Sequence, residues 1–205
     1  MMHPRRRVLG IFTTACALGT AALATLPVAA AQANLVSFNA CDNSSLSQPY
    51  LQWADSDLYK LAPGGDGSLT GWSLQGGAQQ TAGGEPWNVS GTSTNSLLLP
   101  AGAVAASPQT CVNAAYPTFR FFSLAGTPGS SASVTVVYNT LLGPVSIPVG
   151  TVSPDTSWEP SVPMTTLSAI PGLLQGGTAN VQLQFTGVSG TVEVSDVYVD
   201  PWNHG

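Results

Sequence analysis

From residue 96 to residue 200 the chain repeats one pattern, in which short runs of β-branched and aromatic residues are separated by glycine and proline. Ala132–Tyr138 reads ASVTVVY, and in Val181–Phe185 apolar residues alternate with glutamines. Such alternation is typical of a β-strand with one buried face. The chain has 22 glycines and 16 prolines, which favour turns between short strands. We therefore expect an all-β sandwich of about nine or ten antiparallel strands and no long amphipathic helix.

The run Thr118–Leu124 is the most aromatic of these predicted strands. Alternation places Phe119 and Phe121 on one face and Arg120 and Phe122 on the other, so we expect an interior strand. Arg120 is the only arginine after residue 33, and a buried guanidinium needs a carboxylate or several carbonyl groups. Two interpretations stay open: a structural ion pair, or an outward-facing side chain that binds an anion or hydroxyl of a ligand.

The last predicted strand, Thr191–Asp200, contains a change of phase. Its apolar residues are Val192 and Val194 in the first half and Val197 and Val199 in the second. A β-bulge near Ser195 and Asp196 would bring both pairs to one core face. Without a bulge, Asp196 would face the core, and we predict it as the ion-pair partner of Arg120.

The first 33 residues have the character of an export signal. Arg5–Arg7 precede an apolar run, Val8–Val28, and Ala31–Ala33 matches a small-residue cleavage site. Ala29–Ala31 is a competing site, an uncleaved anchor is the alternative on length, and general and twin-arginine export both fit. We expect a secreted, extracellular protein with a signal peptide at 1–33 and one domain, 34–205, whose roughly 170 residues suffice for a full core.

Two cysteines, Cys41 and Cys111, remain after the predicted leader. In an oxidising compartment such a pair forms a disulfide. It would close a loop of about 70 residues, for which the chain-entropy model gives about 4 kcal/mol. With His204 as the only histidine after the leader, a zinc site is not expected.

The predicted mature chain is strongly acidic. Lys60 and Arg120 are its only basic side chains, whereas all ten acidic residues of the sequence lie in it. Nucleic acids and anionic membrane surfaces require clustered cations. We therefore exclude both as partners and expect a glycan or a cell-envelope polymer instead.

Five segments spread over the chain share a pattern with known proteins. They are Pro63–Ala78 (PGGDGSLTGWSLQGGA), Ser96–Pro100 (SLLLP), Cys111–Val112, Pro117–Phe122 (PTFRFF) and Val194–Pro201 (VSDVYVDP). In these segments the chain resembles secreted actinobacterial proteins of unassigned function with a galactose-binding-like domain, the architecture of many carbohydrate-binding modules. The resemblance implies a jelly-roll β-sandwich and suggests a binding function.

Carbohydrate-binding modules of this type often hold a structural calcium on acidic residues, including a Phe-Glu pair before the Gly-x-x-Trp turn. Here Gly67 and Ser68 stand in that position, so a main ligand is missing and the resemblance does not support calcium. Asp55, Asp57 and Asp66 are close in sequence, but aspartates of this kind are typical of turns and caps. We expect no metal and no other cofactor.

Two tryptophans lie in proline-flanked, loop-like contexts, Trp87 after Glu85 and Trp158 before Glu159. Sugar rings stack on flat aromatic faces, and neighbouring polar groups can bind their hydroxyls. We predict these four residues as ligand contacts. The other two candidates, Trp53 and Trp72, fit the core or its rim.

The leading hypothesis is therefore a secreted, non-catalytic module that binds a glycan or a cell-envelope component. One alternative is a structural or protein-interaction surface protein without a small-ligand site. Another is a glycan hydrolase or lyase, which needs two carboxyl groups roughly 5–10 Å apart. A Ser–His–Asp system is disfavoured, because His204 lies at the end of the chain.

Overall fold

The computed structural model describes residues 41, 45–113, 118–140, 143–166 and 178–200, all within the compact unit of residues 32–205. This part contains thirteen strands and one 3-10 turn, η1 (Leu51–Trp53), so the all-β prediction is confirmed. Three strands, β1, β10 and β11, are two residues long, too short to leave an alternating pattern in the sequence. The predicted leader and His204 lie outside the described residues. No helix in the described ranges is long and apolar enough to span a membrane.

Sheet I is antiparallel and has the order β10–β7–β13–β4–β3, with β1 paired to β13 and β11 paired to β7. Its strands are β1 (Lys60–Leu61), β3 (Gln79–Ala82), β4 (Asn95–Pro100), β7 (Thr118–Ala125), β10 (Glu159–Pro160), β11 (Met164–Thr165) and β13 (Thr191–Asp200). As predicted, β7 is an interior strand, because β13 pairs with one edge and β10 and β11 pair with the other.

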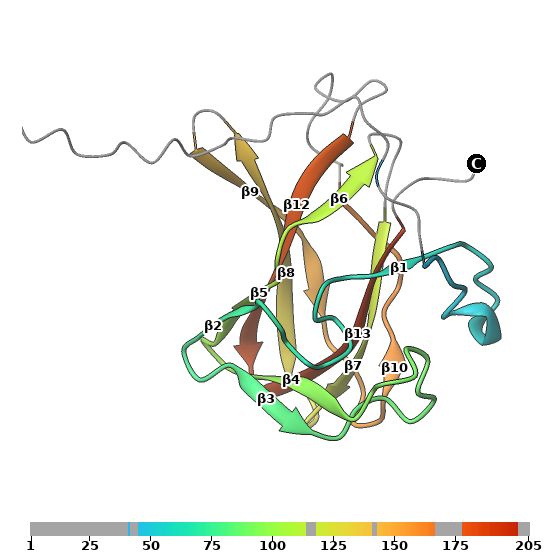
Figure 1. Cartoon of the computed structure of the whole chain (residues 1–205). Coiled ribbons are helices and arrows are strands. Elements are labelled where there is room, and N and C mark those ends of the chain that lie inside the picture. Colours follow the sequence, from blue (N-terminus) through green and yellow to red (C-terminus); the bar gives the residue numbers. More distant parts are fainter. Residues whose placement is uncertain (1–40, 42–44, 114–117, 141–142, 167–177, 201–205) are drawn as a thin grey trace, which may run out of the picture. The chain divides into compact units, whose positions relative to one another are not determined.

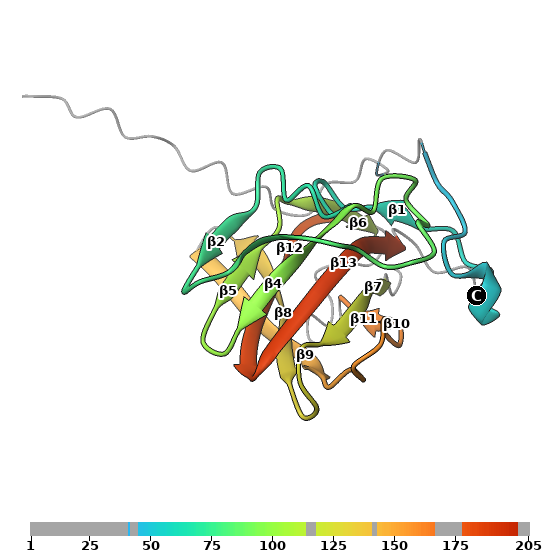
Figure 2. The same ribbon diagram turned by 90° about the horizontal axis from the view of Figure 1, so that it is seen from below.

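Sheet II is also antiparallel, in the order β2–β5–β12–β8–β9, with β6 paired to β12. Its strands are β2 (Ser73–Gln75), β5 (Val104–Ala106), β6 (Thr110–Asn113), β8 (Ser131–Thr140), β9 (Gly143–Val152) and β12 (Thr178–Ser189). β9, which contains Pro148, lies at the end of this order, where a residue without an N–H is tolerated. Figures 1 and 2 show the two sheets as facing layers of a β-sandwich.

The main core lies between the two sheets. It is built from the inward-facing alternate residues of the long strands. The largest fully buried members include Leu97, Leu99, Phe119, Phe121, Val134, Val136, Leu183 and Phe185. Trp72 packs against this core at its rim, with its ring stacked on Phe185 at a centroid distance of 6.0 Å, as the sequence predicts.

The predicted bulge in β13 is present. The register with β7 shifts between Ser195 and Tyr198, and Asp196 has a left-handed φ of 48°. Because the bulge adds a residue, the valines before and after it all join the main core: Val192, Val194, Val197 and Val199. The side chain of Asp196 consequently does not belong to that core.

The connection from β12 to β13 corrects one expectation, since the sequence suggests a hairpin over Gly187–Gly190. β12 pairs with strands of sheet II and β13 with strands of sheet I, so the chain crosses between layers here (Figure 1). Gly187 comes so close to β4 that a Cβ would lie 2.1 Å from the carbonyl oxygen of Pro100. Alternation predicts which face of a strand is buried but not which sheet the strand joins.

The predicted disulfide between Cys41 and Cys111 is present, with an S–S distance of 2.06 Å and a Cα–Cα distance of 5.6 Å. Cys111 lies in β6, so the bond attaches the segment preceding η1 to sheet II. This attachment fixes the start of the segment that forms the site described next.

Candidate functional site

A second apolar cluster lies outside the main core, and we call it the outer aromatic cluster. Its buried members are Tyr50, Tyr59, Phe122 and Tyr198, and Trp53, Leu61, Val89 and Trp158 pack against it. Phe122 and Tyr198 come from β7 and β13, and alternation turns them away from the main core. The face of β7 that carries Phe122 is therefore covered by aromatic rings.

Residues 47–61 form the cover of this cluster. Ser47 pairs with Tyr59 in an isolated bridge, and the intervening chain turns through η1, which ends at Ala54 with a left-handed φ of 62°. This turn inserts Tyr50, whose side chain is fully buried. The Tyr50 ring stacks on Phe122 at a centroid distance of 5.3 Å and meets the edge of Tyr59 at 5.1 Å.

Arg120 is buried beneath this cover. Its Nη1 lies 2.5 Å from Asp55 Oδ2, and its Nε donates a hydrogen bond of 2.8 Å to the carbonyl of Ser161. The guanidinium carbon also lies 4.2 Å from the centre of the Tyr50 ring, a cation–π contact. The prediction that Asp196 is the ion-pair partner of Arg120 is therefore wrong, because the bulge moves Asp196 away and residues 47–61 supply Asp55 instead.

The carboxylate of Asp55 is fully engaged. Besides Arg120, its Oδ2 accepts a hydrogen bond from the Tyr59 hydroxyl (2.8 Å), and Oδ1 accepts one from the backbone N–H of Asp57 (3.0 Å). Partial burial acts to raise the pKa of Asp55, but the N–H of Asp57 and the guanidinium of Arg120 outweigh it and hold that pKa below its ordinary value. Asp55 is thus a fixed negative charge at neutral pH.

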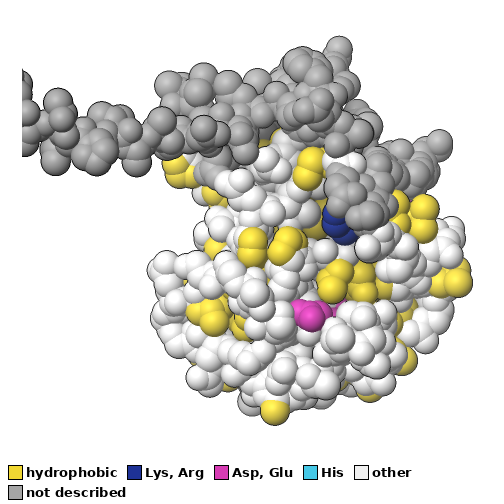
Figure 3. Space-filling model, in the orientation of Figure 1, with side chains coloured by type: hydrophobic (Ala, Val, Ile, Leu, Met, Phe, Trp, Pro, Cys, Tyr) yellow, Lys and Arg dark blue, Asp and Glu magenta, His cyan; other side chains and the backbone are white. Residues whose placement is uncertain are grey.

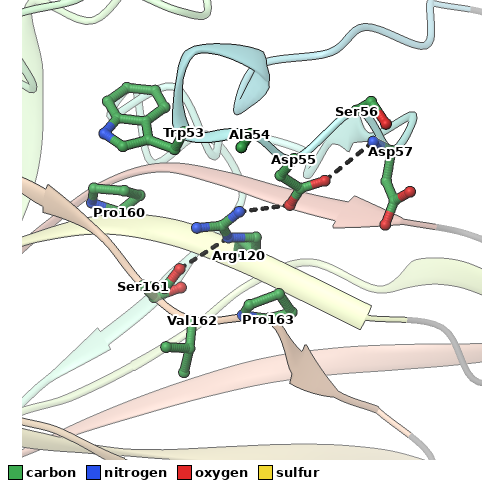
Figure 4. Close-up of a pocket in the computed structure, with 10 residues that line it drawn as sticks. All are labelled: Trp53, Ala54, Asp55, Ser56, Asp57, Arg120, Pro160, Ser161, Val162 and Pro163. Atoms are coloured by element: carbon green, nitrogen blue, oxygen red, sulfur yellow. Dashed lines mark hydrogen bonds and ion pairs between the residues drawn. The ribbon is translucent and has the colours of Figure 1, made fainter.

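A pocket of about 490 Å³ opens beside this ion pair. Figure 4 shows Arg120 between two walls, one of which carries Asp55. One wall comes from the end of η1 and the chain after it, and the other from the end of β10 and the chain that leads to β11. Besides Arg120, the lining residues are Trp53, Ala54, Asp55, Ser56, Asp57, Pro160, Ser161, Val162 and Pro163. The lining combines a tryptophan, aliphatic carbon, hydroxyl groups and carboxylates.

An exposed tryptophan continues this surface. The Trp87 ring meets the Trp53 ring nearly at right angles, with centroids 4.9 Å apart, and lies 5.6 Å from Phe122. Trp87 is 40 % exposed, although both neighbours hold its ring. Trp53, which lines the pocket, and Trp87, which packs on it, therefore form a supported aromatic platform.

The four residues predicted as ligand contacts have different positions. Trp87 is on the platform, and Trp158 packs partly buried against the outer aromatic cluster. Glu159 accepts a hydrogen bond of 3.2 Å from the backbone N–H of Asp155. Glu85 is buried, with 2 % of its surface exposed, which leaves it no access to a ligand.

Glu85 instead organises the loop that carries Trp87. Its two carboxylate oxygens accept hydrogen bonds of 2.6 Å from the backbone N–H groups of Trp87 and Val89. Ser93 Oγ lies 3.0 Å from Glu85 Oε1 and also bonds Asp196 Oδ2. Burial first, and then the hydrogen bond and charge of Glu85, raise the pKa of Asp196 to about 7.

These acidic residues do not fit a calcium site. Calcium takes six to eight oxygen ligands, whereas nowhere in the described ranges do three or more His, Cys, Asp or Glu residues gather. Both oxygens of Glu85 are already bonded to backbone N–H groups. We therefore assign no metal to this pair.

One face of the molecule, seen in Figure 3, carries little charge. On the face seen in Figure 3, small acidic and basic spots lie among uncharged atoms and scattered apolar side chains. Apart from the paired Arg120, the described residues contain a single basic side chain, Lys60. This distribution favours uncharged ligands over anionic ones.

Sequence reasoning missed most of the pocket. The run Trp53–Asp57 holds an aromatic ring and two carboxylates within five residues, which is a usable signal. The opposite wall, Pro160–Pro163, has no comparable signal, because only pairing with β7 brings it to Arg120.

No protein-family model matches this chain, and no curated protein matches it. Solved structures with a similar fold include a C-terminal family 6 carbohydrate-binding module of a laminarinase from Zobellia galactanivorans (9 % identity, 62 % of this chain and 90 % of that one, TM-score 0.43). Another is a tandem of family 22 carbohydrate-binding modules from Paenibacillus barcinonensis (12 % identity, 72 % of this chain and 46 % of that one, TM-score 0.49). A third is a family 61 carbohydrate-binding module in complex with β-1,4-galactotriose (12 % identity, 68 % of this chain and 97 % of that one, TM-score 0.41).

Proposed function

We propose that this protein is a secreted, non-catalytic module that binds a neutral glycan at the pocket and platform beside the outer aromatic cluster. The observation that carries the proposal is the exposed Trp87 ring, fixed against Trp53, which itself lines a polar pocket. An aromatic face offers stacking area to the C–H face of a sugar at little entropic cost. The hydroxyls and carboxylates of the pocket supply partners for the sugar hydroxyl groups.

The charges of the pocket favour a neutral saccharide over a uronate. Asp55 already neutralises Arg120, and Asp57 adds a carboxylate on the exposed wall. A ligand carboxylate would meet repulsion there, without a cation left to compensate it. The preferred ligand is therefore an uncharged chain of hexoses or pentoses.

The ionisation of Asp55 supports a non-catalytic function. A glycosidase requires a carboxylic acid that holds its proton near neutral pH, together with a second carboxylate. Asp55 has a lowered pKa, and the acid with a raised pKa, Asp196, is completely buried and is not part of the pocket lining. Release of reducing ends from a polysaccharide, lost on Asp57→Asn, would overturn the non-catalytic assignment.

The experiment is a glycan array followed by calorimetric titration of the best neutral ligand. Trp87→Ala should raise Kd about tenfold, equivalent to 1.4 kcal/mol. Val145→Ala, which truncates an exposed residue on β9 of sheet II, is the matched control and should leave Kd unchanged. Absence of binding to any saccharide, or equal affinity of Trp87→Ala and the unmodified protein, would refute the proposal.

A further inference from the structure

Asp196 occupies an unusual position for a carboxyl group. It lies in the β13 bulge, is completely buried and has a left-handed backbone. Its Oδ2 is hydrogen-bonded to Ser93 Oγ, while its Oδ1 is buried without a hydrogen-bond partner in the described structure. An ionised carboxylate with so few donors is strongly disfavoured away from water.

Ser93 lies between two buried carboxyl groups. Its Oγ contacts Asp196 Oδ2 on one side and Glu85 Oε1, at 3.0 Å, on the other. A serine hydroxyl has a single proton and can donate to only one of them. Because Glu85 accepts the N–H groups of Trp87 and Val89, it acts as the acceptor, and the second proton must come from Asp196.

We propose that Asp196, Ser93 and Glu85 form a buried relay of hydrogen bonds, in which protonated Asp196 donates to Ser93 Oγ and Ser93 donates to Glu85. Loss of the Asp196 proton then loosens the loop that carries Trp87 and weakens ligand binding. The part concerning ligand binding rests on the proposed function. Glu85 and Asp196 are thereby positioning residues for the platform.

The surroundings of Asp196 offer it no compensating cation. The titratable groups that interact with Asp196 or with its neighbours are Glu85, Tyr50, Tyr198 and Asp66, and the Ser90 and Ser93 hydroxyls also interact with its carboxyl group. Arg120 lies over the Tyr50 ring. The tyrosines are neutral near pH 7, and Arg120 is paired with Asp55. Burial and Glu85 raise the pKa of Asp196 to about 7, which places its ionisation in the neutral range.

Ionisation has a defined structural consequence. Two buried carboxylates would then compete for the single Ser93 proton, at close range and in surroundings of low polarity. The loop can relieve this repulsion by moving Glu85 toward water. Since Glu85 holds the backbone of Trp87 and Val89, that movement displaces the platform.

The test follows the Trp87 and Val89 amide resonances of the purified protein by ¹⁵N–¹H NMR from about pH 5 to about pH 9, a range that spans the raised pKa. Both should shift with a midpoint near 7. In parallel, Kd for the best neutral glycan should rise about tenfold across this range. Asp196→Asn, which keeps a donor for Ser93, should remove both pH dependences, whereas the control Asp155→Asn, at an exposed position outside this loop, should keep them.

Several outcomes decide the matter. A titration of the loop resonances that persists in Asp196→Asn overturns the relay. If Asp196→Asn does not fold, Ser93→Ala replaces it and should give loop resonances that no longer titrate near pH 7; unchanged titration in that variant contradicts the relay. A titrating loop in a protein that binds no glycan supports the relay and refutes only the proposed function.

Discussion

Asp55 and Asp196 both lie in the surroundings of Tyr50, and their environments drive their ionisation in opposite directions. Asp55 contacts Arg120, whose guanidinium lies over the Tyr50 ring, whereas the Tyr50 hydroxyl is 3.5 Å from the backbone carbonyl of Asp196. Asp55 has a cation and two further donors, and its pKa is lowered. Asp196 faces another acid, and burial raises its pKa to about 7.

The difference shows that partners, more than residue type, decide what a buried carboxyl group does. The paired acid stays charged and shapes a pocket for ligand. The unpaired acid keeps a proton and, in our proposal, uses it to hold a loop. Both act on the same surface, because Trp53 lines the pocket and Trp87, which packs on it, belongs to the loop fixed by Glu85.

Breaking the charged pair should have the largest effect. Arg120→Ala leaves Asp55 without its cation and removes the group stacked on Tyr50. We expect the free energy of unfolding to fall by about 3–5 kcal/mol, the usual cost of removing one partner of a buried ion pair. Urea denaturation at neutral pH measures it, and a loss below about 1 kcal/mol would mean that the pair is effectively a surface one.

Removing the carboxyl group of Asp196, which lies beside Glu85, should change the free energy of unfolding in the opposite sense. Asp196→Asn removes a carboxylate that is buried with too few donors, so at about pH 8.5 it should raise the free energy of unfolding by about 2 kcal/mol. At about pH 5 folded Asp196 still holds its proton and only the unfolded state has lost it, so the gain in the free energy of unfolding should be smaller than at about pH 8.5. Urea denaturation at the two pH values, with the exposed Asp155→Asn as control, would contradict the comparison if Asp196→Asn destabilised equally at both.

How much of this could be predicted from sequence depends on the range of each interaction. Alternation placed Arg120 and Phe122 on one face of β7, and the phase change of the valines predicted the bulge in β13. The partner of Arg120 could not be predicted, because Asp55 is 65 residues away in a segment without periodicity. Glu85 looked like a loop residue beside an exposed ring, since no local pattern reveals that Ser93 and the bulge bury it.

The two acids should also produce opposite limbs in the pH profile of stability. Because the pKa of Asp55 is lowered, its contribution to the stability of the folded state is present above the ordinary pKa of 3.8. It is lost as pH falls through the lowered pKa. Because the pKa of Asp196 is raised, its contribution to the stability of the folded state is fully present below pH 3.8 and is lost as pH rises through about 7. Thermal unfolding from about pH 2 to about pH 9 should show both limbs, with Asp55→Asn flattening the acid limb and Asp196→Asn the neutral one.

The smallest effect is expected at Asp57. Its side chain is exposed, and it is the backbone N–H of Asp57 that bonds Asp55. Asp57→Asn should therefore change the free energy of unfolding by less than about 0.5 kcal/mol. A larger change in urea denaturation would show that the Asp57 carboxylate, and not only its backbone, supports the ion pair.

The central claim is that a neutral glycan binds on the platform of Trp53 and Trp87. The tryptophan indole N–H resonances provide local reporters, because Trp72 packs on Phe185 at the rim of the main core, away from the outer aromatic cluster. Titration of the protein with the best neutral oligosaccharide should shift the indole signals of Trp53 and Trp87 and leave that of Trp72 in place. Shifts confined to Trp72, or none at saturating ligand, would contradict the claim.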